Sequence, residues 1–551
     1  MKRNSLLILA FVLISFSAMA QLGSPKETFT RADSLRGNLT PLRTCYDIGY
    51  YHLNVKFDIG NKFISGSTLF KFTTVQDFTK LQFDLFANLK VEKVVYKGRE
   101  LPYTREFNAV FVTFPKIIKK GSKDEFIVYY SGNPTIAKHA PWDGGIVYAK
   151  DSIGNPWVAT ACQGVGASIW WPNKDQQADE VDSALISITV PTGLQDVSNG
   201  RLRKVTDLKN GYTRFDWFVA NPINNYDIEA NIGKYTHFGD SYDGEKGKLS
   251  LDYWVLTYDL EKAKKQFDEN VKDMIKAFEY WFGPYPFYED GYKLIEAPHL
   301  GMEHQSGTAY GNHFKNGYLG SDLSGTGWGL KWDFIIVHES GHEWFGNNIT
   351  SKDIADMWIH ESFTNYSESL FIEQRYGKQA GQEYVHGIRF RIENDKPIVG
   401  LYNVNKEGSE DMYYKGGNLM NMIRTIINDD EKWRSILRGL NKTFYHQTVT
   451  YNDIVDYISD KAGKNLNPVF DQYLHYKNIP ILDLMFMHGK LYCRWIADVK
   501  DFNMPVKVRT KGGDYQFITP STKFEPVSIK DATKDNIEVD TFNYYIGVLV
   551  E

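Results

Sequence analysis

Residues 337–344, with the sequence VHESGHEW, constrain the fold and chemistry of the chain more than any other segment. Two histidines four residues apart, His338 and His342, lie on the same face of a helix, so both imidazoles can reach a single metal ion. The apolar spacing of residues 331–337 is typical of a buried helix. The segment therefore predicts a buried helix that presents two metal ligands.

A third ligand is available further along the chain. Glu361 lies in a second apolar-periodic segment, which runs to about residue 375, and two adjacent buried helices can present imidazoles and a carboxylate to one ion. Glu339, beside the first histidine, can take a proton from a water that the metal activates. This set predicts a zinc hydrolase. The alternative is a metal-free buried network, in which all four side chains would need other polar partners.

The length of the chain predicts several domains, because 551 residues are too many for one hydrophobic core. Residues 46–233 show short alternating strands punctuated by Gly, Asn and Pro, which predicts an antiparallel β-sandwich or saddle. Helical periodicity follows to about residue 476, including an amphipathic stretch that ends at Gly283-Pro284. Strand alternation returns after Pro480. The predicted domains are an N-terminal β domain (21–236), a metal-holding domain (237–478) and a small Ig-like β domain (479–551).

Residues 1–20 have the pattern of a signal peptide. A basic start is followed by an apolar run over residues 6–16 and by the small-residue ending SAMA, which predicts Gln21 as the mature N-terminus. The apolar run is too short for a membrane anchor. We therefore expect an exported protein, periplasmic or secreted, with no stable membrane insertion once the signal is removed.

Charge and cysteine content exclude some classes of protein. The formal net charge is −5 and no basic stripe occurs, so nucleic acid is not an expected partner. Cys45, Cys162 and Cys493 are too few for a disulfide framework, although one pair could form in an oxidising compartment. Aromatic residues make up 15% of the chain, which suits β-rich modules and a peptide-binding cleft.

Two further segments, PHLGMEHQS at 298–306 and DMYYKGG at 411–417, accompany the helix pair. Together they resemble the aminopeptidase-N-like family of gluzincins, which includes the leukotriene-epoxide hydrolase. The resemblance covers nearly all of the predicted mature chain. It implies a multidomain α+β fold: an N-terminal antiparallel β-sandwich or saddle, a thermolysin-like mixed helical catalytic domain and a small C-terminal β-sandwich. It also implies one Zn²⁺ per chain.

The resemblance assigns roles to individual residues. The family pattern H-E-x-x-H-x18-E falls on the metal ligands His338, His342 and Glu361 and on Glu339 as general base. The family tyrosine of Y-x-K-G falls on Tyr413, which would donate a hydrogen bond to the oxyanion.

The substrate-binding residues follow from the same resemblance. The signature that is usually G-A-M-E-N falls on residues 300–304, and its acid, Glu303, would pair with the free α-ammonium of a peptide. A glutamine or glutamate of the β domain also contacts that amine in the family, and Gln163 occupies its place. The implied substrate-binding residues are Gln163, Gly301, Met302 and Glu303.

The chain departs from the family pattern at several positions. Leu300, Gly301 and His304 differ from the usual signature, which puts the side-chain pocket in question. His360 and Glu343 replace a common Asn and Gln beside the ligands. Many relatives carry a large C-terminal helical domain that roofs the active site, and we expect no such domain here and a more open cleft.

The residues and the resemblance together predict a zinc aminopeptidase that hydrolyses the N-terminal bond of peptides with a free N-terminus. The alternatives are an endopeptidase of thermolysin type, an epoxide hydrolase on the same fold, and an inactive scaffold. Glu303 argues against the endopeptidase, because an internal peptide bond offers no ammonium to balance its charge. An inactive relative would be expected to lose metal ligands, and all three are present. Side-chain preference and oligomeric state stay open.

Overall fold

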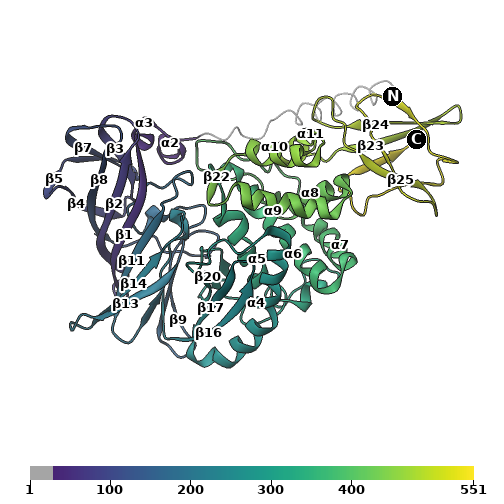
Figure 1. The fold of residues 1–551 in the computed structure, drawn as a ribbon. Helices are drawn as coiled ribbons and strands as arrows, with labels where there is room; N and C mark the ends of the chain where they lie inside the picture. Colours follow the sequence, from purple (N-terminus) through teal and green to yellow (C-terminus); the bar gives the residue numbers. More distant parts are fainter. Residues whose placement is uncertain (1–28) are drawn as a thin grey trace, which may run out of the picture.

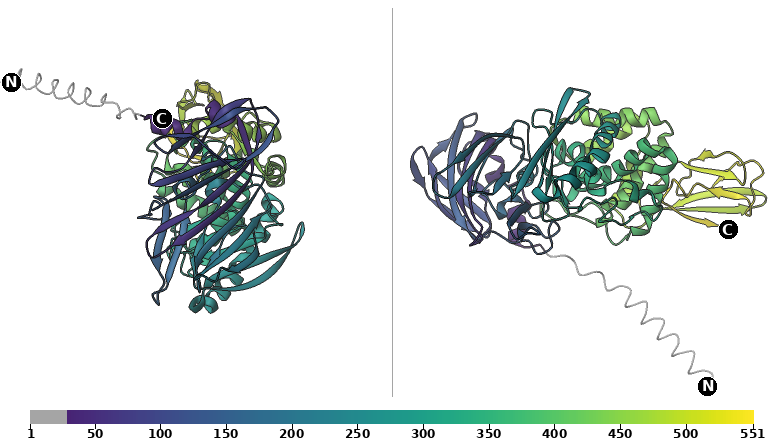
Figure 2. Two further views of the ribbon diagram at one scale, coloured as in Figure 1. Left: turned by 90° about the vertical axis from the view of Figure 1, so that its left-hand side faces the viewer. Right: turned by 90° about the horizontal axis from the view of Figure 1, so that it is seen from below.

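The computed structural model describes residues 29–551, and the predicted signal peptide lies outside the described residues. The described chain is elongated: a β-rich N-terminal region, a central region of helices around a sheet, and a C-terminal β region follow one another (Figures 1 and 2). The two β regions lie at opposite ends of the central one. This arrangement confirms the predicted multidomain α+β fold class.

The largest sheet of the N-terminal region has eight strands in the order β13-β14-β11-β1-β2-β8-β4-β5. Alternate residues of β1, such as Leu53, Val55 and Phe57, are buried, as the alternating pattern predicts. Strands β1 and β11 pair in parallel, so the sheet is mixed rather than wholly antiparallel. A parallel pair needs a long crossover, and β2 to β10 lie between these two strands in the sequence. The strands are β1 (Tyr46–Asp58), β2 (Phe63–Thr74), β4 (Leu89–Tyr96), β5 (Arg99–Leu101), β8 (Lys123–Gly132), β11 (Ser183–Pro191), β13 (Arg201–Asp207) and β14 (Tyr212–Val219).

Two smaller sheets and two short helices complete the N-terminal region. Strand β10 ends at Ala161, so the loop that carries Gln163 leaves the end of its sheet toward the central region. The three-stranded sheet contains β3 (Phe78–Asp84), β6 (Tyr103–Glu106) and β7 (Ala109–Ile118), and the four-stranded sheet contains β9 (Gly145–Lys150), β10 (Pro156–Ala161), β12 (Gln195–Val197) and β15 (Asn231–Gly233). The helices are α2 (Arg31–Gly37) and α3 (Pro41–Thr44).

The central region begins with a five-stranded sheet in the order β16-β17-β18-β20-β19. Its strands are β16 (Tyr235–Gly244), β17 (Gly247–Leu256), β18 (Tyr292–Glu296), β19 (Gly301–Met302) and β20 (Thr308–Tyr310). Helix α4 (Leu260–Phe282) ends at Gly283, whose φ of 98° favours glycine, and this confirms the predicted helix stop. The other elements are α5 (Phe334–Gly341), α6 (Trp358–Tyr376), α7 (Lys378–Gly387), α8 (Tyr414–Ile427), α9 (Asp430–Thr443), α10 (Tyr451–Ala462) and α11 (Asn467–Leu474), with the short strands β21 (Ile349–Ser351) and β22 (Gln447–Val449).

Helices α5 and α6 pack against each other inside this region. The side chain of Asp333 caps α5 by accepting a hydrogen bond from the backbone NH of Ile336. The chain then leaves helical geometry at Phe345 (φ −128°, ψ 96°) and Gly346 (φ 138°). His342 thus lies at the end of α5, still in helical conformation, rather than within a longer helix. The spacing of the two histidines is therefore retained, and the non-helical turn that follows can contact His342.

The C-terminal region contains two sheets, of four and three strands. Within the described residues no helix follows α11, and no helix is long and apolar enough to cross a membrane. The three cysteines are buried and free. The predicted domain boundaries fall at the start of β16 and between α11 and β23. The strands are β23 (Ile481–Met487), β24 (Lys490–Ile496), β25 (Val506–Thr510), β26 (Gln516–Ile518), β27 (Glu525–Val527), β28 (Ile537–Val539) and β29 (Gly547–Val550).

Candidate metal centre and substrate cavity

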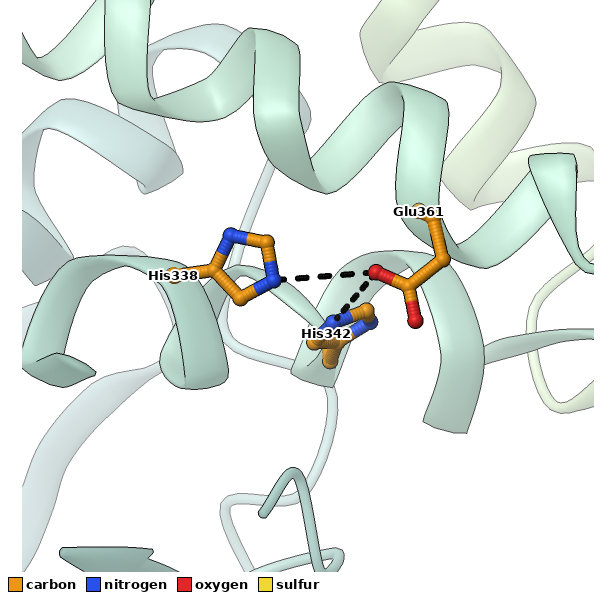
Figure 3. A group of neighbouring side chains, drawn as sticks. All are labelled: His338, His342 and Glu361. Carbon is orange, nitrogen blue, oxygen red and sulfur yellow. Dashed lines mark ion pairs between the residues drawn. The ribbon is translucent and has the colours of Figure 1, made fainter. Parts of the chain in front are cut away.

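Three side chains from α5, its end and α6 point toward one another (Figure 3). The Nε2 atoms of His338 and His342 lie 3.6 and 3.4 Å from Oε2 of Glu361. All three side chains are buried, and this Oε2 atom has no hydrogen-bond partner among the described residues. Tetrahedral ligands about 2.0–2.2 Å from zinc lie roughly 3.3–3.6 Å from one another. The spacing of the donor atoms therefore fits a divalent cation.

The other ring nitrogens of the two histidines are held by the protein. Nδ1 of His338 lies 2.8 Å from Oε1 of Glu368, and Nδ1 of His342 lies 3.1 Å from the carbonyl oxygen of Phe345. Such contacts orient each imidazole so that Nε2 is left for a metal. No motif in the sequence predicted Glu368. Its signal is spacing, because it follows Glu361 by two helical turns and lies on the same face of α6.

Buried carboxylates surround the imidazoles. Burial lowers the pKa of His338, but the contacts with Glu361 and Glu368 outweigh burial and hold this pKa well above its ordinary value. Burial raises the pKa of Glu339 to about 7 and also raises the pKa of Glu303. In the absence of a cation this cluster therefore favours protonated imidazoles. A divalent cation would displace those protons on binding, so the charge of the site also fits a metal.

Strand β19 lies directly against the motif helix. A Cβ atom on Gly301 would lie 2.8 Å from Oε1 of Glu339 and equally close to Cγ2 of Ile335. The usual family residue at this position is alanine, and a methyl group would push against both side chains. The departure at Gly301 therefore has a physical reason: glycine lets β19 approach Glu339 closely.

Gln163 and Glu303 contact each other beside the proposed metal ligands. Nε2 of Gln163 donates to Oε1 of Glu303 at 2.6 Å and to Oε1 of Glu361 at 3.2 Å. Gln163 comes from the N-terminal β region, whereas Glu303 follows β19. The backbone carbonyl of Glu303 accepts a hydrogen bond from Nδ2 of Asn347 at 2.8 Å. Glu303 is thus fixed from two directions, with its carboxylate beside the metal ligands.

The segment after Glu303 is fastened to the N-terminal β region. Nδ1 of His304 lies 2.8 Å from Oε2 of Glu229, and both side chains are fully buried. Nδ2 of Asn199 donates to the carbonyl oxygen of Gln305 at 2.8 Å. In the sequence, His304 is a departure from the family signature with no predicted role. Its observed role is a contact across two regions of the molecule, which local sequence could not show.

The two departures beside the metal ligands support the backbone. Nε2 of His360 accepts a hydrogen bond from the backbone NH of Ser351 at 2.9 Å. Oε1 of Glu343 accepts one from the backbone NH of Ser306 at 2.8 Å. Both side chains are buried. They hold neighbouring loops and leave the set of three donors unchanged.

Tyr413 stands at the start of α8, on the other side of the metal centre. Its ring centroid lies 6.1 Å from that of His338, and its side chain is half-buried. The following Gly416 has no room for a Cβ atom, which would lie 1.9 Å from Oγ of Ser362 on α6. This glycine therefore lets α8 pack closely on α6 and places Tyr413 over the site.

A cavity of about 610 Å³ opens over the metal centre, and every residue predicted for the site lines it. These residues are Gln163, Gly301, Met302, Glu303, His338, Glu339, His342, Glu361 and Tyr413. Two of the lining residues that no motif predicted are Trp142 and Glu407. Trp142 is 71% exposed at the cavity, and Glu407 comes from the loop before α8. Neither belongs to a motif, so only the fold brings them to the site.

Comparison with known proteins shows which proteins the chain resembles. Residues 269–473 match the model of the Peptidase family M1 domain. The chain is 21% identical to leucyl aminopeptidase of Saccharolobus solfataricus over 413 residues, which cover 72% of this chain and 49% of the relative. It is 24% identical to aminopeptidase B of Homo sapiens over 383 residues, which cover 65% and 53%. The chain thus spans about half the length of these relatives.

The fold also matches solved structures. An M1 zinc metallopeptidase from Deinococcus radiodurans has a TM-score of 0.65 and 17% identity, with 79% of this chain and 95% of that chain covered. A variant of that protein with the same TM-score is bound to the substrate Tyr-Ser-Ala. Residues 269–473 therefore resemble the Peptidase family M1 domain, and the solved structures show that the overall fold is shared.

Proposed function

We propose that the protein is a zinc aminopeptidase that removes the first residue of peptides with a free N-terminus. The observation that carries this proposal is the position of Glu303. Its buried carboxylate faces the cavity beside the metal ligands and is held by Gln163. A peptide's free α-ammonium would supply the opposite charge, and an internal peptide bond would not.

One zinc ion per chain is proposed to bind to His338, His342 and Glu361. When bound, zinc would act as a Lewis acid toward the scissile carbonyl and lower the pKa of water in the site. The family match and the donor spacing support this metal. Treatment with a chelator should abolish activity, and added zinc should restore it with one equivalent bound. Full activity after complete metal removal would contradict the proposal.

The chain's own residues would perform the remaining steps. Glu339 would take the proton of the attacking water and deliver it to the leaving amine. Tyr413 would donate a hydrogen bond to the oxygen on which negative charge develops, and loss of such a donor typically costs about 3 kcal/mol. Glu303 and Gln163 would hold the ammonium, so that only the first peptide bond reaches Glu339.

A pair of substrates tests the exopeptidase assignment. We expect hydrolysis of aminoacyl substrates with a free amine and none of their N-acetylated counterparts, because acetylation removes the charge that Glu303 would bind. The measurement is release of a chromogenic amine at matched concentrations. Equal rates on the two substrates would favour an endopeptidase instead.

The location of the protein is a separate proposal, which rests on the sequence of residues 1–20. We propose export to the periplasm or the medium, without stable insertion in the membrane and without a nucleic-acid partner. N-terminal sequencing of the protein recovered from the cell envelope and medium should give Gln21 as the first residue. An intact N-terminus on a cytoplasmic protein would contradict the proposal.

A further inference from the structure

The loop before α8 places an acidic side chain in the cavity, away from the metal ligands. Glu407 lines the cavity, is half-buried, and has no hydrogen bond or ion pair within the described residues 29–551. Glu303 and Glu361 differ from it, because they contact Gln163 or the histidines, and Glu339 has a proposed role as general base. Glu407 is therefore a carboxylate that the reaction does not use and that the protein does not pair.

The position of Glu407 is set by contacts between two regions. Nδ2 of Asn405 donates to the carbonyl oxygen of Gly164 at 3.2 Å. A Cβ atom on Gly164 would lie 3.1 Å from Oε1 of Glu407, so this carboxylate oxygen lies close above the Gly164 backbone. Gly164 directly follows Gln163, which holds Glu303. The carboxylate of Glu407 is thus next to the segment that would bind the peptide's first residue.

The charges around Glu407 are mainly negative. Burial raises its pKa to about 7, and the nearby carboxylates of Glu361, Glu410 and Glu303 add to this increase. Lys396 acts in the opposite direction but is exposed at the rim and forms no ion pair with Glu407. Lys396 and Lys406 also line the cavity, but within residues 29–551 no cationic side chain forms an ion pair with Glu407.

We propose that Glu407 selects peptides whose first residue has a cationic side chain, arginine or lysine. The inference rests on the proposed aminopeptidase function, in which Glu303 and Gln163 hold the α-ammonium. With the amine fixed there, a long side chain could run along Gly164 and place its charge against Glu407. Guanidinium and ammonium groups both form charge-assisted hydrogen bonds with a carboxylate, whereas a neutral side chain leaves it unpaired.

The first test compares aminoacyl-methylcoumarin substrates on the full-length, zinc-loaded protein. We expect kcat/KM for arginyl and lysyl substrates to exceed that for the methionyl substrate about tenfold, with the glutamyl substrate slowest; tenfold corresponds to 1.4 kcal/mol. If no free-amine substrate is hydrolysed, the proposed function fails. If methionyl or glutamyl substrates are preferred, only the assignment of Glu407 fails.

Substitutions then test the residue itself. Glu407→Gln should lower the arginyl-to-methionyl ratio of kcat/KM about tenfold, and Glu407→Lys should shift preference toward the glutamyl substrate. A gain for glutamyl substrate cannot result from misfolding. The comparison variant is Glu410→Gln, whose exposed carboxylate lines the same cavity near Glu407, and it should retain the ratio. A ratio unchanged in Glu407→Gln, or lost in Glu410→Gln instead, would overturn the proposal.

Discussion

The metal end and the amine end of the cavity are built in different ways. At the metal end, His338, His342 and Glu361 come from α5, its end and the next long helix, which pack against each other within the central region. At the amine end, Gln163 of the β region meets Glu303 of the central region. The first arrangement depends on two neighbouring helices, and the second depends on how two regions dock. Substitutions should therefore separate metal binding from recognition of the peptide's end.

The largest effect is expected at the metal end. Glu339→Gln should lower kcat by about 10²–10⁴-fold, because the amide cannot act as general base. The variant should retain zinc, since Glu339 is not one of the proposed ligands His338, His342 and Glu361, although it lies in a second group with Glu303 and His342. Metal analysis together with turnover on an aminoacyl substrate measures both properties. Unchanged turnover would remove Glu339 as the base.

The next effect concerns the amine end. Glu303→Ala should raise KM and lower kcat for dipeptides, together by about 10²-fold in kcat/KM, since the lost contact both binds and orients the substrate. Zinc content should stay at the wild-type level. Steady-state kinetics on dipeptides is the measurement. Wild-type values of KM and kcat in Glu303→Ala would contradict the role assigned to Glu303 in binding the α-ammonium.

A substitution at Glu368, which contacts the ring nitrogen of His338 that does not face the proposed metal, should change metal affinity alone. Glu368→Gln weakens the contact with Nδ1 of His338, and loss of such support typically reduces metal affinity about 10–100-fold. Titration against a zinc chelator measures the affinity. The matched control is Glu373→Gln, one turn and a half further along α6, where the carboxylate pairs with Arg424 and not with a ligand histidine. Equal zinc affinities for the two variants would show that Glu368 does not tune the metal.

The smallest effect on catalysis is expected at the contact between regions. Glu229→Gln replaces the carboxylate that lies 2.8 Å from Nδ1 of His304, and loss of a buried polar contact typically lowers the free energy of unfolding by about 1–3 kcal/mol. At temperatures where the variant is folded, KM for free-amine substrates should rise about tenfold while zinc affinity is retained. Denaturant unfolding and zinc titration check the two parts. A loss of zinc with an unchanged KM would contradict the separation of the two ends.

Sequence patterns predicted much of this molecule because the relevant contacts are local or periodic. The stop of α4 at Gly283 follows from helix chemistry, and the alternation of β1 follows from strand geometry. The parallel pairing of β1 with β11 was not predicted, since both strands have the same alternating pattern as an antiparallel pair. The period of the hydrophobic pattern does not by itself specify which strands are neighbours in the sheet.

Within the site, too, local patterns predicted some residues but not the contacts between distant segments. The spacing of His338 and His342 determines a shared helix face, and the apolar pattern around Glu361 indicated a third ligand. Motif resemblance then added Glu303 and Tyr413. The partner of His304 lies 75 positions earlier in the chain, at Glu229, and no local pattern links the two. Side chains without a motif were missed for the same reason, because their neighbours are brought together only by packing.

The sequence by itself determined the candidate metal ligands, the order of β and helical regions, and the chemistry that two imidazoles and two glutamates on neighbouring helices can support. These features depend on residues a few positions apart or on repeating patterns, which each helix or strand expresses locally. Only the tertiary structure decided that Glu407 lies against Gly164 and that Glu229 holds the Glu303 segment. Those contacts join distant segments, so they exist only once the β region has docked on the central one.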